Sequence, residues 1–263
     1  MRFLTMSDTK IRVESITHGY SIGNSTIEAL KDVSLNVRQG EFFTIIGPSG
    51  CGKSTLLNII AGLIRPTSGK VFVDGTELKG PMPGKLAYVF QQPLLLPWRT
   101  VLDNVAFGLE MQGLPKKKRV SVGKQLVELV GLRGFEYMYP GELSGGMQQR
   151  VAIARALAVN PDVLLMDEPF GALDEQTRLQ LGIELTKLWM VTKKTIVFVT
   201  HSLSEAAFLS DRIAVMRKRP GSIIGIIEVN AERPRDPESP EIQKVRSELW
   251  KMLKEQGQEN IIV

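Results

Sequence analysis

Short apolar runs alternate with long helical stretches along this chain of 263 residues. Nearly continuous apolar runs of strand length lie at residues 42–46, 86–90, 163–166 and 195–200. Strands that are apolar on both faces are typical of a parallel sheet that helices cover on either side. The pattern therefore predicts an α/β core built on a parallel sheet.

Strands rich in Val and Ile are also expected outside this core, towards both ends of the chain. They lie at residues 11–16, 34–37, 212–216 and 223–229. Their position before and after the core runs suggests that they form an antiparallel β edge.

Between residues 91 and 158 the pattern changes to helices. Residues 101–111, 115–130 and 145–159 have helical character, and no strand is expected among them. We therefore expect a helical subdomain, at about residues 92–158, inserted into a domain that spans residues 1–230.

The last part of the chain, residues 231–263, is expected to contain a linker and a helix. The prolines and charges of residues 233–237 interrupt the strand pattern and predict the linker. Apolar residues then recur at helical spacing, at Ile242, Val245, Leu249 and Leu253. This amphipathic helix either docks on the domain or binds a partner.

Composition narrows the class of protein. The chain is 43% hydrophobic and 23% charged, which is an ordinary composition for a globular protein. Its single cysteine excludes an internal disulfide, and we therefore expect a protein of the reducing cytosol. We find no secretory leader pattern, and no uncharged stretch has the roughly 18 residues of a membrane span. The net charge is +5, but the charges are scattered and aromatic residues do not interleave with them, so we expect no nucleic-acid partner.

The most specific motif is a complete phosphate-binding loop. It follows the first core strand and precedes an apolar segment, residues 56–64, that is expected to be helical. Glycines let the backbone amides of such a loop point inward, and the helix N-terminus adds positive potential. We expect Lys53 to reach the β- and γ-phosphates and the Ser54 hydroxyl to ligate Mg²⁺. The loop consists of Gly47, Pro48, Ser49, Gly50, Cys51, Gly52, Lys53, Ser54 and Thr55.

Two carboxylates follow the apolar run at residues 163–166. A parallel strand would place Asp167 at the carboxyl edge of the sheet, where it can hold Mg²⁺ through water. Glu168 could then orient or deprotonate the water that attacks the γ-phosphorus. The alternative is an ordinary surface Asp-Glu pair at a strand end, but the upstream loop favours the catalytic interpretation.

A second anion site is predicted before the helix at residues 145–159. Ser144 is a good N-cap, and Gly145 and Gly146 leave the first backbone amides of the helix uncovered. One chain thus carries two helix N-termini that can face phosphates.

These three motifs together resemble those of the nucleotide-binding subunit of an ABC transporter, and the resemblance covers nearly the whole chain. It implies a P-loop NTPase (RecA-like) core, with ATP and Mg²⁺ as cofactors. It also implies a homodimer, in which ATP lies between the phosphate loop of one subunit and Ser144 of the other.

The resemblance assigns roles to four further residues. Gln91 is similar to the glutamine that senses Mg²⁺ and the attacking water, and His201 to the histidine that contacts the γ-phosphate. Asp174, in Ala172-Leu173-Asp174, is similar to the aspartate that crosses the dimer interface, and Tyr20 to the aromatic residue that stacks on adenine. Each could instead be structural, which is the role we expect for His18.

Residues 93–105, 166–174, 220–223 and 233–236 further resemble the importers of nitrate, sulfonates, taurine and related small solutes. Such importers use a membrane permease and an external solute-binding protein, and their ATPase lies peripherally on the cytoplasmic side of the membrane. His201-Ser202 departs from the usual His-Asp of this group. The alternative is a soluble ABC ATPase of another process, such as DNA repair or translation.

A partner surface is expected at residues 94–98, where three leucines lie between two prolines and a tryptophan follows the second proline. Such a run does not suit a regular element, so part of it could remain exposed to a permease helix. Burial and exposure are equally open for the leucines, whereas we expect Trp98 to lie at an interface.

Overall fold

The computed structural model describes residues 8–23, 25–171 and 173–255. The chain divides into two compact units. Unit 1 consists of Met1–Met82 and Lys193–Val263, and unit 2 of Pro83–Thr192. The phosphate loop and the C-terminal helix belong to unit 1, whereas the helices expected at residues 92–158 belong to unit 2.

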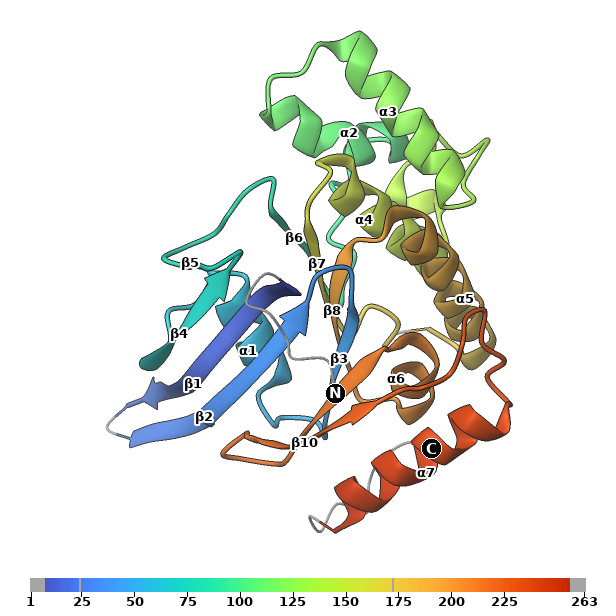
Figure 1. The fold of residues 1–263 in the computed structure, drawn as a ribbon. Helices are drawn as coiled ribbons and strands as arrows, with labels where there is room; N and C mark the ends of the chain where they lie inside the picture. Colours follow the sequence, from blue (N-terminus) through green and yellow to red (C-terminus); the bar gives the residue numbers. More distant parts are fainter. Residues whose placement is uncertain (1–7, 24, 172, 256–263) are drawn as a thin grey trace. The chain divides into compact units, whose positions relative to one another are not determined.

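The first sheet of unit 1 is antiparallel throughout and has the strand order β2-β1-β4-β5 (Figure 1). It consists of β1 (Thr9–Ile22), β2 (Ser25–Arg38), β4 (Ser68–Val73) and β5 (Thr76–Glu77). Exposed and buried residues alternate along the second half of β2, as in a sheet with one face towards solvent.

The second set of strands in unit 1 has the order β10-β9-β3-β8. It consists of β3 (Phe42–Ile46), β8 (Thr195–Thr200), β9 (Arg212–Met216) and β10 (Ile223–Glu228). β3 is parallel to both β8 and β9, whereas β10 is antiparallel to β9. Every residue of β3 and β8 is buried, as their apolar sequences predict.

The expected antiparallel edge is therefore only partly present. β10 is such an edge strand, but β9 runs parallel to β3, and the opening strands form a sheet of their own. Burial explains the difference, because β9 is almost entirely buried, as a central parallel strand is, whereas much of β2 is exposed.

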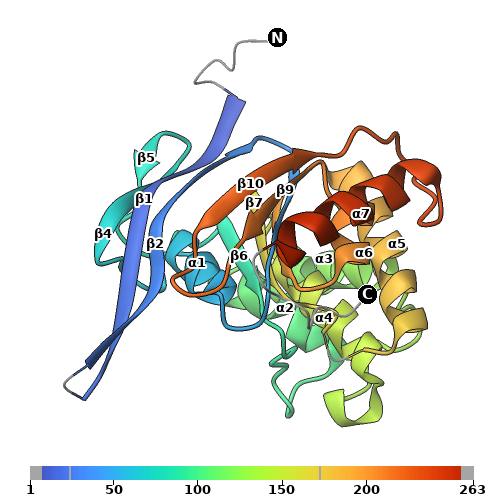
Figure 2. The ribbon, with the colours of Figure 1, turned by 90° about the horizontal axis from the view of Figure 1, so that it is seen from below.

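Three helices complete unit 1: α1 (Lys53–Ile60), α6 (Leu203–Leu209) and α7 (Pro240–Lys254). The apolar stripe of α7 packs in one cluster with residues of α6, β9 and β10 (Figure 2). The buried residues of α7 are the four of the expected amphipathic pattern, Ile242, Val245, Leu249 and Leu253. The helix therefore docks on its own unit.

Unit 2 combines a pair of parallel strands, β6 (Leu86–Val89) and β7 (Val163–Asp167), with several helices. The helices are α2 (Val101–Met111), α3 (Lys116–Leu129), the short 3₁₀ turn η2 (Pro140–Glu142), α4 (Gly145–Ala158) and α5 (Glu175–Thr192). α2, α3 and α4 share one hydrophobic cluster, so the helices expected from the sequence form a single packed group.

A buried arginine fastens the segment between β10 and α7. The Arg235 guanidinium donates hydrogen bonds to the carbonyls of Phe208 (2.9 Å) and Ser210 (2.6 Å) at the end of α6. It also donates to Ala231 (3.1 Å) and Val229 (3.4 Å). Burial lowers the pKa of Arg235 to about 10, so the group stays charged at neutral pH and its hydrogen bonds offset the cost of desolvation.

We predict that Arg235→Met lowers the free energy of unfolding by about 2–4 kcal/mol, because it leaves several buried carbonyls without a donor. Urea unfolding of the full chain measures this change. Lys244→Met is the matched control, since Lys244 is exposed on α7. Equal effects of the two substitutions would contradict the assignment.

Candidate functional site

The phosphate loop connects a buried parallel strand to a helix. It leaves the carboxyl end of β3 and continues into α1, which begins at Lys53 and ends at Ile60. The expected helix at residues 56–64 is thus displaced by three to four residues. Gly52 is the N-cap of α1, and no side chain caps this end of the helix. Its first backbone amides therefore face an anion site without a competing side chain.

Two glycines of the loop are required by close contacts. Gly52 has φ +98°, and a Cβ there would lie 2.7 Å from Leu30 Cδ2 and 2.9 Å from the Ala29 carbonyl oxygen. A Cβ on Gly47 would lie 2.8 Å from both Cys51 Sγ and the Met216 carbonyl oxygen. The loop therefore takes its shape only with glycine at both positions.

Lys53 folds back against the start of its own loop. Its side chain is buried, and Nζ donates hydrogen bonds to the carbonyl oxygens of Gly47 (2.9 Å) and Pro48 (3.2 Å). An ammonium group beside an uncapped helix N-terminus is a donor set that suits the oxygens of a nucleotide phosphate. The residues present therefore fit the expected nucleotide.

Tyr20 lies at the far end of this loop. Its hydroxyl is 3.1 Å from Thr55 Oγ1, and 41% of the residue is exposed. The ring packs edge-on against His18, with the ring centroids 4.8 Å apart. An exposed aromatic ring beside the phosphate loop is suitably placed to stack on a base, while His18 supports it from the side.

His201 follows β8, and the register places it beside the same loop. Ile46 of β3 pairs with Thr200 of β8, so the next residues, Gly47 and His201, both leave the carboxyl ends of adjacent parallel strands. Ligands of such sheets bind at this edge. Ser202 then caps α6 by accepting a hydrogen bond from the Glu205 amide (3.3 Å). Serine and aspartate are both good N-caps, which accounts for the departure from His-Asp.

A second group of expected residues gathers in unit 2, at the ends of β6 and β7. Val89 pairs with Met166, so Gln91 and the two carboxylates leave neighbouring strands at the same edge. The Tyr88 hydroxyl donates to Asp167 (3.2 Å), and burial together with this carboxylate raises the pKa of Tyr88. Tyr88 was not expected from the sequence.

Glu168 and Gln91 meet around Gly171. Glu168 has φ +41°, and its carbonyl accepts a hydrogen bond from the Gly171 amide (3.0 Å). A Cβ on Gly171 would lie 3.4 Å from Gln91 Nε2 and 3.8 Å from Glu168 Cβ. The structure therefore places Gln91 and Glu168, for which related roles are expected, beside the same residue, Gly171.

The third group lies where α4 and α5 begin. Ser144 accepts a hydrogen bond from the Met147 amide (3.3 Å) and is the expected N-cap of α4. A Cβ on Gly146 would lie 2.9 Å from Thr177 Cγ2, so glycine permits α4 to approach α5 closely. A Cβ on Gly145 would be 3.6 Å from Leu173.

Asp174 serves as a cap in the described structure. Its carboxylate accepts hydrogen bonds from the Thr177 amide (2.9 Å) and hydroxyl (2.7 Å), and these bonds lower the pKa of Asp174. Ala172, which the same motif includes, lies outside the described residues. Ser144 and Asp174 are thus placed at two adjoining helix starts.

One contact at the phosphate loop was missed by the sequence analysis. Arg219, between β9 and β10, donates a hydrogen bond from Nε to the Gly50 carbonyl (2.9 Å). The only signal in the sequence is its position directly before Pro220 and Gly221, within a segment that resembles the importer group.

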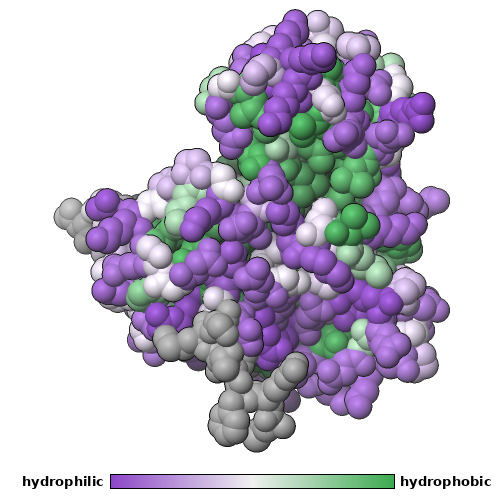
Figure 3. Space-filling view, turned by 45° about the horizontal axis from the view of Figure 1, so that its top comes forward, coloured by the Kyte–Doolittle hydropathy of each residue, from purple (hydrophilic) through white to green (hydrophobic). Residues whose placement is uncertain are grey.

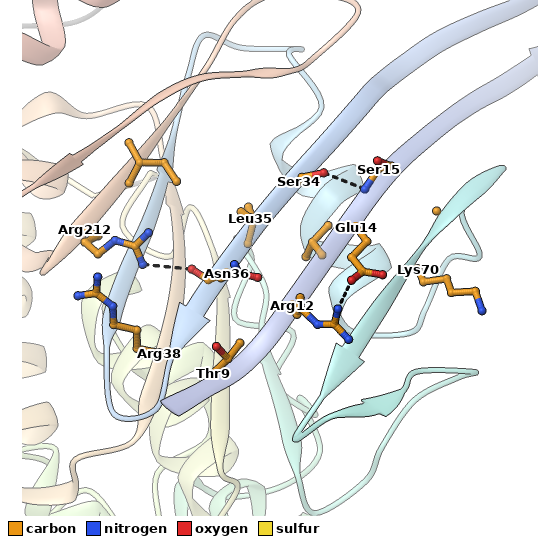
Figure 4. Close-up of a pocket in the computed structure, with 13 residues that line it drawn as sticks. Thr9, Arg12, Glu14, Ser15, Ser34, Leu35, Asn36, Arg38, Lys70 and Arg212 are labelled. Atoms are coloured by element: carbon orange, nitrogen blue, oxygen red, sulfur yellow. Dashed lines mark hydrogen bonds and ion pairs between the residues drawn. The ribbon is translucent and has the colours of Figure 1, made fainter. Parts of the chain in front are cut away.

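A separate pocket of unit 1 contains none of these residues (Figure 4). It is lined mainly by β1 and β2, and each of its basic residues pairs with a carboxylate, either in the pocket or just outside it. Arg12 pairs with Glu14, and Arg212 Nη1 is 3.1 Å from Glu41 Oε1. Because these charges are compensated, the pocket does not compete with the phosphate loop as the nucleotide site.

Comparison with known proteins gives one family. The sequence model of the family described as "ABC transporter" matches residues 30–171. An uncharacterized ABC transporter ATP-binding protein of Methanocaldococcus jannaschii is 53% identical over 247 residues, which is 94% of this chain and 92% of the relative.

Two relatives carry functional names. An aliphatic sulfonates import ATP-binding protein of Bacillus cereus is 43% identical over 94% of this chain and 97% of its own length. A taurine import ATP-binding protein of Roseobacter denitrificans is 42% identical over 94% of this chain and 96% of its own length.

A solved structure has the same fold. It is the dimeric post-hydrolysis state of an ATP-binding cassette bound to ADP and Pi, with a TM-score of 0.75 and 36% identity over 84% of this chain and all of the other. The expected fold class is thereby confirmed. Within the described residues, no helix is both long and apolar enough to span a bilayer.

We predict that Lys53→Ala weakens ATP binding by about 10–100-fold, because it removes a charged donor from the phosphates. A filter-binding assay with labelled ATP measures this loss. Lys70→Ala is the control, since Lys70 pairs with Glu77 on the exposed surface of β4 and β5. Unchanged affinity of Lys53→Ala would rule out the assigned role.

Proposed function

Because the chain belongs to the ABC transporter family, we propose that it is the ATP-hydrolysing subunit of an importer for a small solute such as a sulfonate, taurine or nitrate. The similarity to sulfonate and taurine import subunits along nearly the whole chain is the observation that carries this proposal. The subunit would act through a separate permease, with a solute-binding protein as an indirect partner, at the cytoplasmic side of the membrane.

The chemistry of the proposed subunit is ATP hydrolysis. Lys53 and the amides of the phosphate loop bind the β- and γ-phosphates, and Tyr20 stacks on the adenine. Glu168 acts as the general base for the attacking water, and His201 contacts the γ-phosphate. Phosphoryl transfer depends mainly on positioning and electrostatics, which suits a site made of amides, one ammonium group and fixed carboxylates.

Mg²⁺ would complete the proposed site, where it would neutralise charge on the β- and γ-phosphates. We assign Ser54, Asp167 and Gln91 to it. A hydroxyl, a carboxylate and an amide oxygen are the oxygen donors that Mg²⁺ prefers. Asp167 is also fixed by the hydrogen bond from Tyr88, which holds the carboxylate at the end of β7.

Two subunits would be needed for turnover. In the proposed homodimer, ATP lies between the phosphate loop of one subunit and the Ser144–Gly146 segment of the other. The dimeric state of the related cassette with ADP and Pi supports this arrangement. The start of α4 also offers backbone amides to an anion, and a second source of positive potential compensates the γ-phosphate.

The permease surface is proposed at residues 93–100 of unit 2. Trp98 is 71% exposed and Leu94 is 54% exposed, whereas Leu95 packs on the helical cluster. Hydrophobic residues gather on the surface of the helical part of this unit (Figure 3). An exposed apolar surface of this kind is typical of a docking site for another protein.

Two polar side chains hold this irregular segment in shape. Asn104 is fully buried, accepts a hydrogen bond from the Leu96 amide (2.8 Å) and donates to the Leu96 carbonyl (3.1 Å). Arg155 donates to the carbonyls of Pro93 and Leu94, both at 2.7 Å. The surface is therefore formed before a partner binds, which reduces the entropy cost of docking.

The alternative function is that of a soluble ABC ATPase in DNA repair or translation. The functional names of the import relatives favour the importer. The exposed Trp98 surface also favours the importer, because a surface that is already held in shape suits stable binding to one partner, such as a permease.

We predict that Glu168→Gln retains ATP binding but lowers hydrolysis by about 10²–10⁴-fold, because the amide cannot accept a proton from water. Proteoliposomes with the permease measure hydrolysis together with uptake of labelled taurine, an alkanesulfonate or nitrate. Uptake should be lost together with hydrolysis.

Glu175→Gln is the control for this experiment, since Glu175 is an exposed carboxylate in the first turn of α5. Near-normal phosphate release by Glu168→Gln would contradict its role as the base. Vigorous hydrolysis by wild type with no uptake of any of the three solutes would contradict the proposed substrate class.

We predict that Trp98→Ala hydrolyses ATP in isolation but no longer co-purifies with the permease, because the substitution removes an exposed anchor. Pull-down from detergent extracts tests assembly. Val191→Ala provides the comparison, since Val191 is 77% exposed at the end of α5. Normal assembly of Trp98→Ala would exclude it as an anchor.

A further inference from the structure

A second loop lies against the phosphate loop in unit 1. It consists of residues 217–222, between β9 and β10, and a hydrogen bond from the Arg217 amide to the Ser222 carbonyl (3.1 Å) closes it. We call it the brace loop. It contacts two successive residues of the phosphate loop. The side chain of Arg219 contacts Gly50, and the backbone of Gly221 contacts Cys51.

Arg219 makes the first of these contacts. Its Nε donates to the Gly50 carbonyl at 2.9 Å, across 169 positions of sequence. In a planar trans peptide the carbonyl and the next amide point in opposite directions. Because the Gly50 carbonyl is held on the guanidinium, the Cys51 amide points to the other side of the peptide, where it donates a hydrogen bond to the Pro48 carbonyl (3.3 Å).

Gly221 makes the second contact and joins the brace loop to β2. Its amide donates to the Ala29 carbonyl, and its own carbonyl accepts from the Lys31 amide, both at 2.9 Å. A Cβ on Gly221 would lie only 2.0 Å from the Cys51 carbonyl oxygen. The brace loop thus lies between β2 and the phosphate loop, with no room for a side chain at this position.

These contacts close a ring of elements around the nucleotide site. β2 pairs with β1 next to Tyr20, through Tyr20 and Ile27, and Tyr20 reaches the end of the phosphate loop at Thr55. The brace loop connects the same strand, β2, to the middle of the phosphate loop, at Gly50 and Cys51. The base side and the phosphate side of the site are therefore held by one continuous set of backbone and side-chain hydrogen bonds.

Building on the proposed function, we propose that Arg219 is a positioning residue for nucleotide binding. Through the Gly50 carbonyl, it holds the phosphate loop in the conformation that receives the β- and γ-phosphates. It acts on affinity for the nucleotide, and the hydrolytic step at Glu168 does not depend on it.

The neighbouring Lys218 provides a matched comparison. It is exposed, carries the same charge in the same loop, and forms no hydrogen bond or ion pair within the described chain. Lys218→Ala therefore removes charge near the site without removing a bond to the phosphate loop. Arg219→Lys keeps the charge and a donor that can reach a carbonyl, although without the planar fork of arginine.

The test is binding of the fluorescent analogue mant-ATP with Mg²⁺ to the full chain, together with steady-state hydrolysis. Arg219→Ala should raise both the Kd and the KM about ten-fold, the size expected for one charge-assisted hydrogen bond. The kcat at saturating ATP should stay within about two-fold of wild type. Arg219→Lys should recover part of the affinity, and Lys218→Ala should bind as wild type does.

Two further readouts separate positioning from general stability. The Tm of Arg219→Ala should stay within about 2 °C of wild type, because the arginine is exposed. Amide hydrogen exchange in residues 49–53 should become faster in this variant while the helices of unit 2 remain unchanged. Arg219→Gln, which keeps a neutral donor, is the second variant for the same measurements.

Several results would overturn the proposal. They are unchanged mant-ATP affinity in both Arg219→Ala and Arg219→Gln, equal losses in Arg219→Ala and Lys218→Ala, or a fall in kcat at unchanged affinity. Wild type that failed to bind mant-ATP would overturn the proposed function itself. If wild type binds mant-ATP and both Arg219 variants bind it equally well, only the role of the brace loop is overturned.

Discussion

The site depends on one constraint: a loop presents its amides to a phosphate only if the carbonyls of the same peptides are held on the other side. Here the Gly50 carbonyl is bonded to Arg219, and the Cys51 carbonyl lies against Gly221. Gly47 and Gly52 in turn abut the backbones of Met216 and Ala29. The shape of the loop is therefore set by β2 and β9 as much as by its own glycines.

The proposed mechanism divides its tasks between the two units. Unit 1 carries the groups for binding the nucleotide, namely Lys53, Tyr20 and His201, and unit 2 carries Asp167 and Glu168 for hydrolysis. Unit 2 also carries the exposed surface around Trp98. The surface proposed for the permease thus belongs to the same compact unit as the proposed general base.

Much of this site could be predicted from the sequence because its signals are local. β3 and β8 are apolar on both faces, and Ser144 directly precedes two glycines and a helix. The sequence pattern predicts the start of α1 three residues too late, because the first turn, Lys53-Ser54-Thr55, contains no apolar residue that would mark a buried helix face. β4 and β5 were missed because most of their residues are exposed. No local pattern reveals a bond between residues as distant in the sequence as Arg219 and Gly50.

Contacts between distant residues also set the position of His201. This histidine precedes α6, a helix too short to be stable alone. α6 has seven residues, fewer than an isolated helix needs, so contacts at its ends must hold it. Ser202 caps its N-terminus, and Arg235 binds the carbonyls of Phe208 and Ser210 at the other end. Since α6 begins two residues after His201, the segment before α7 contributes to the position of this histidine without approaching the phosphate loop.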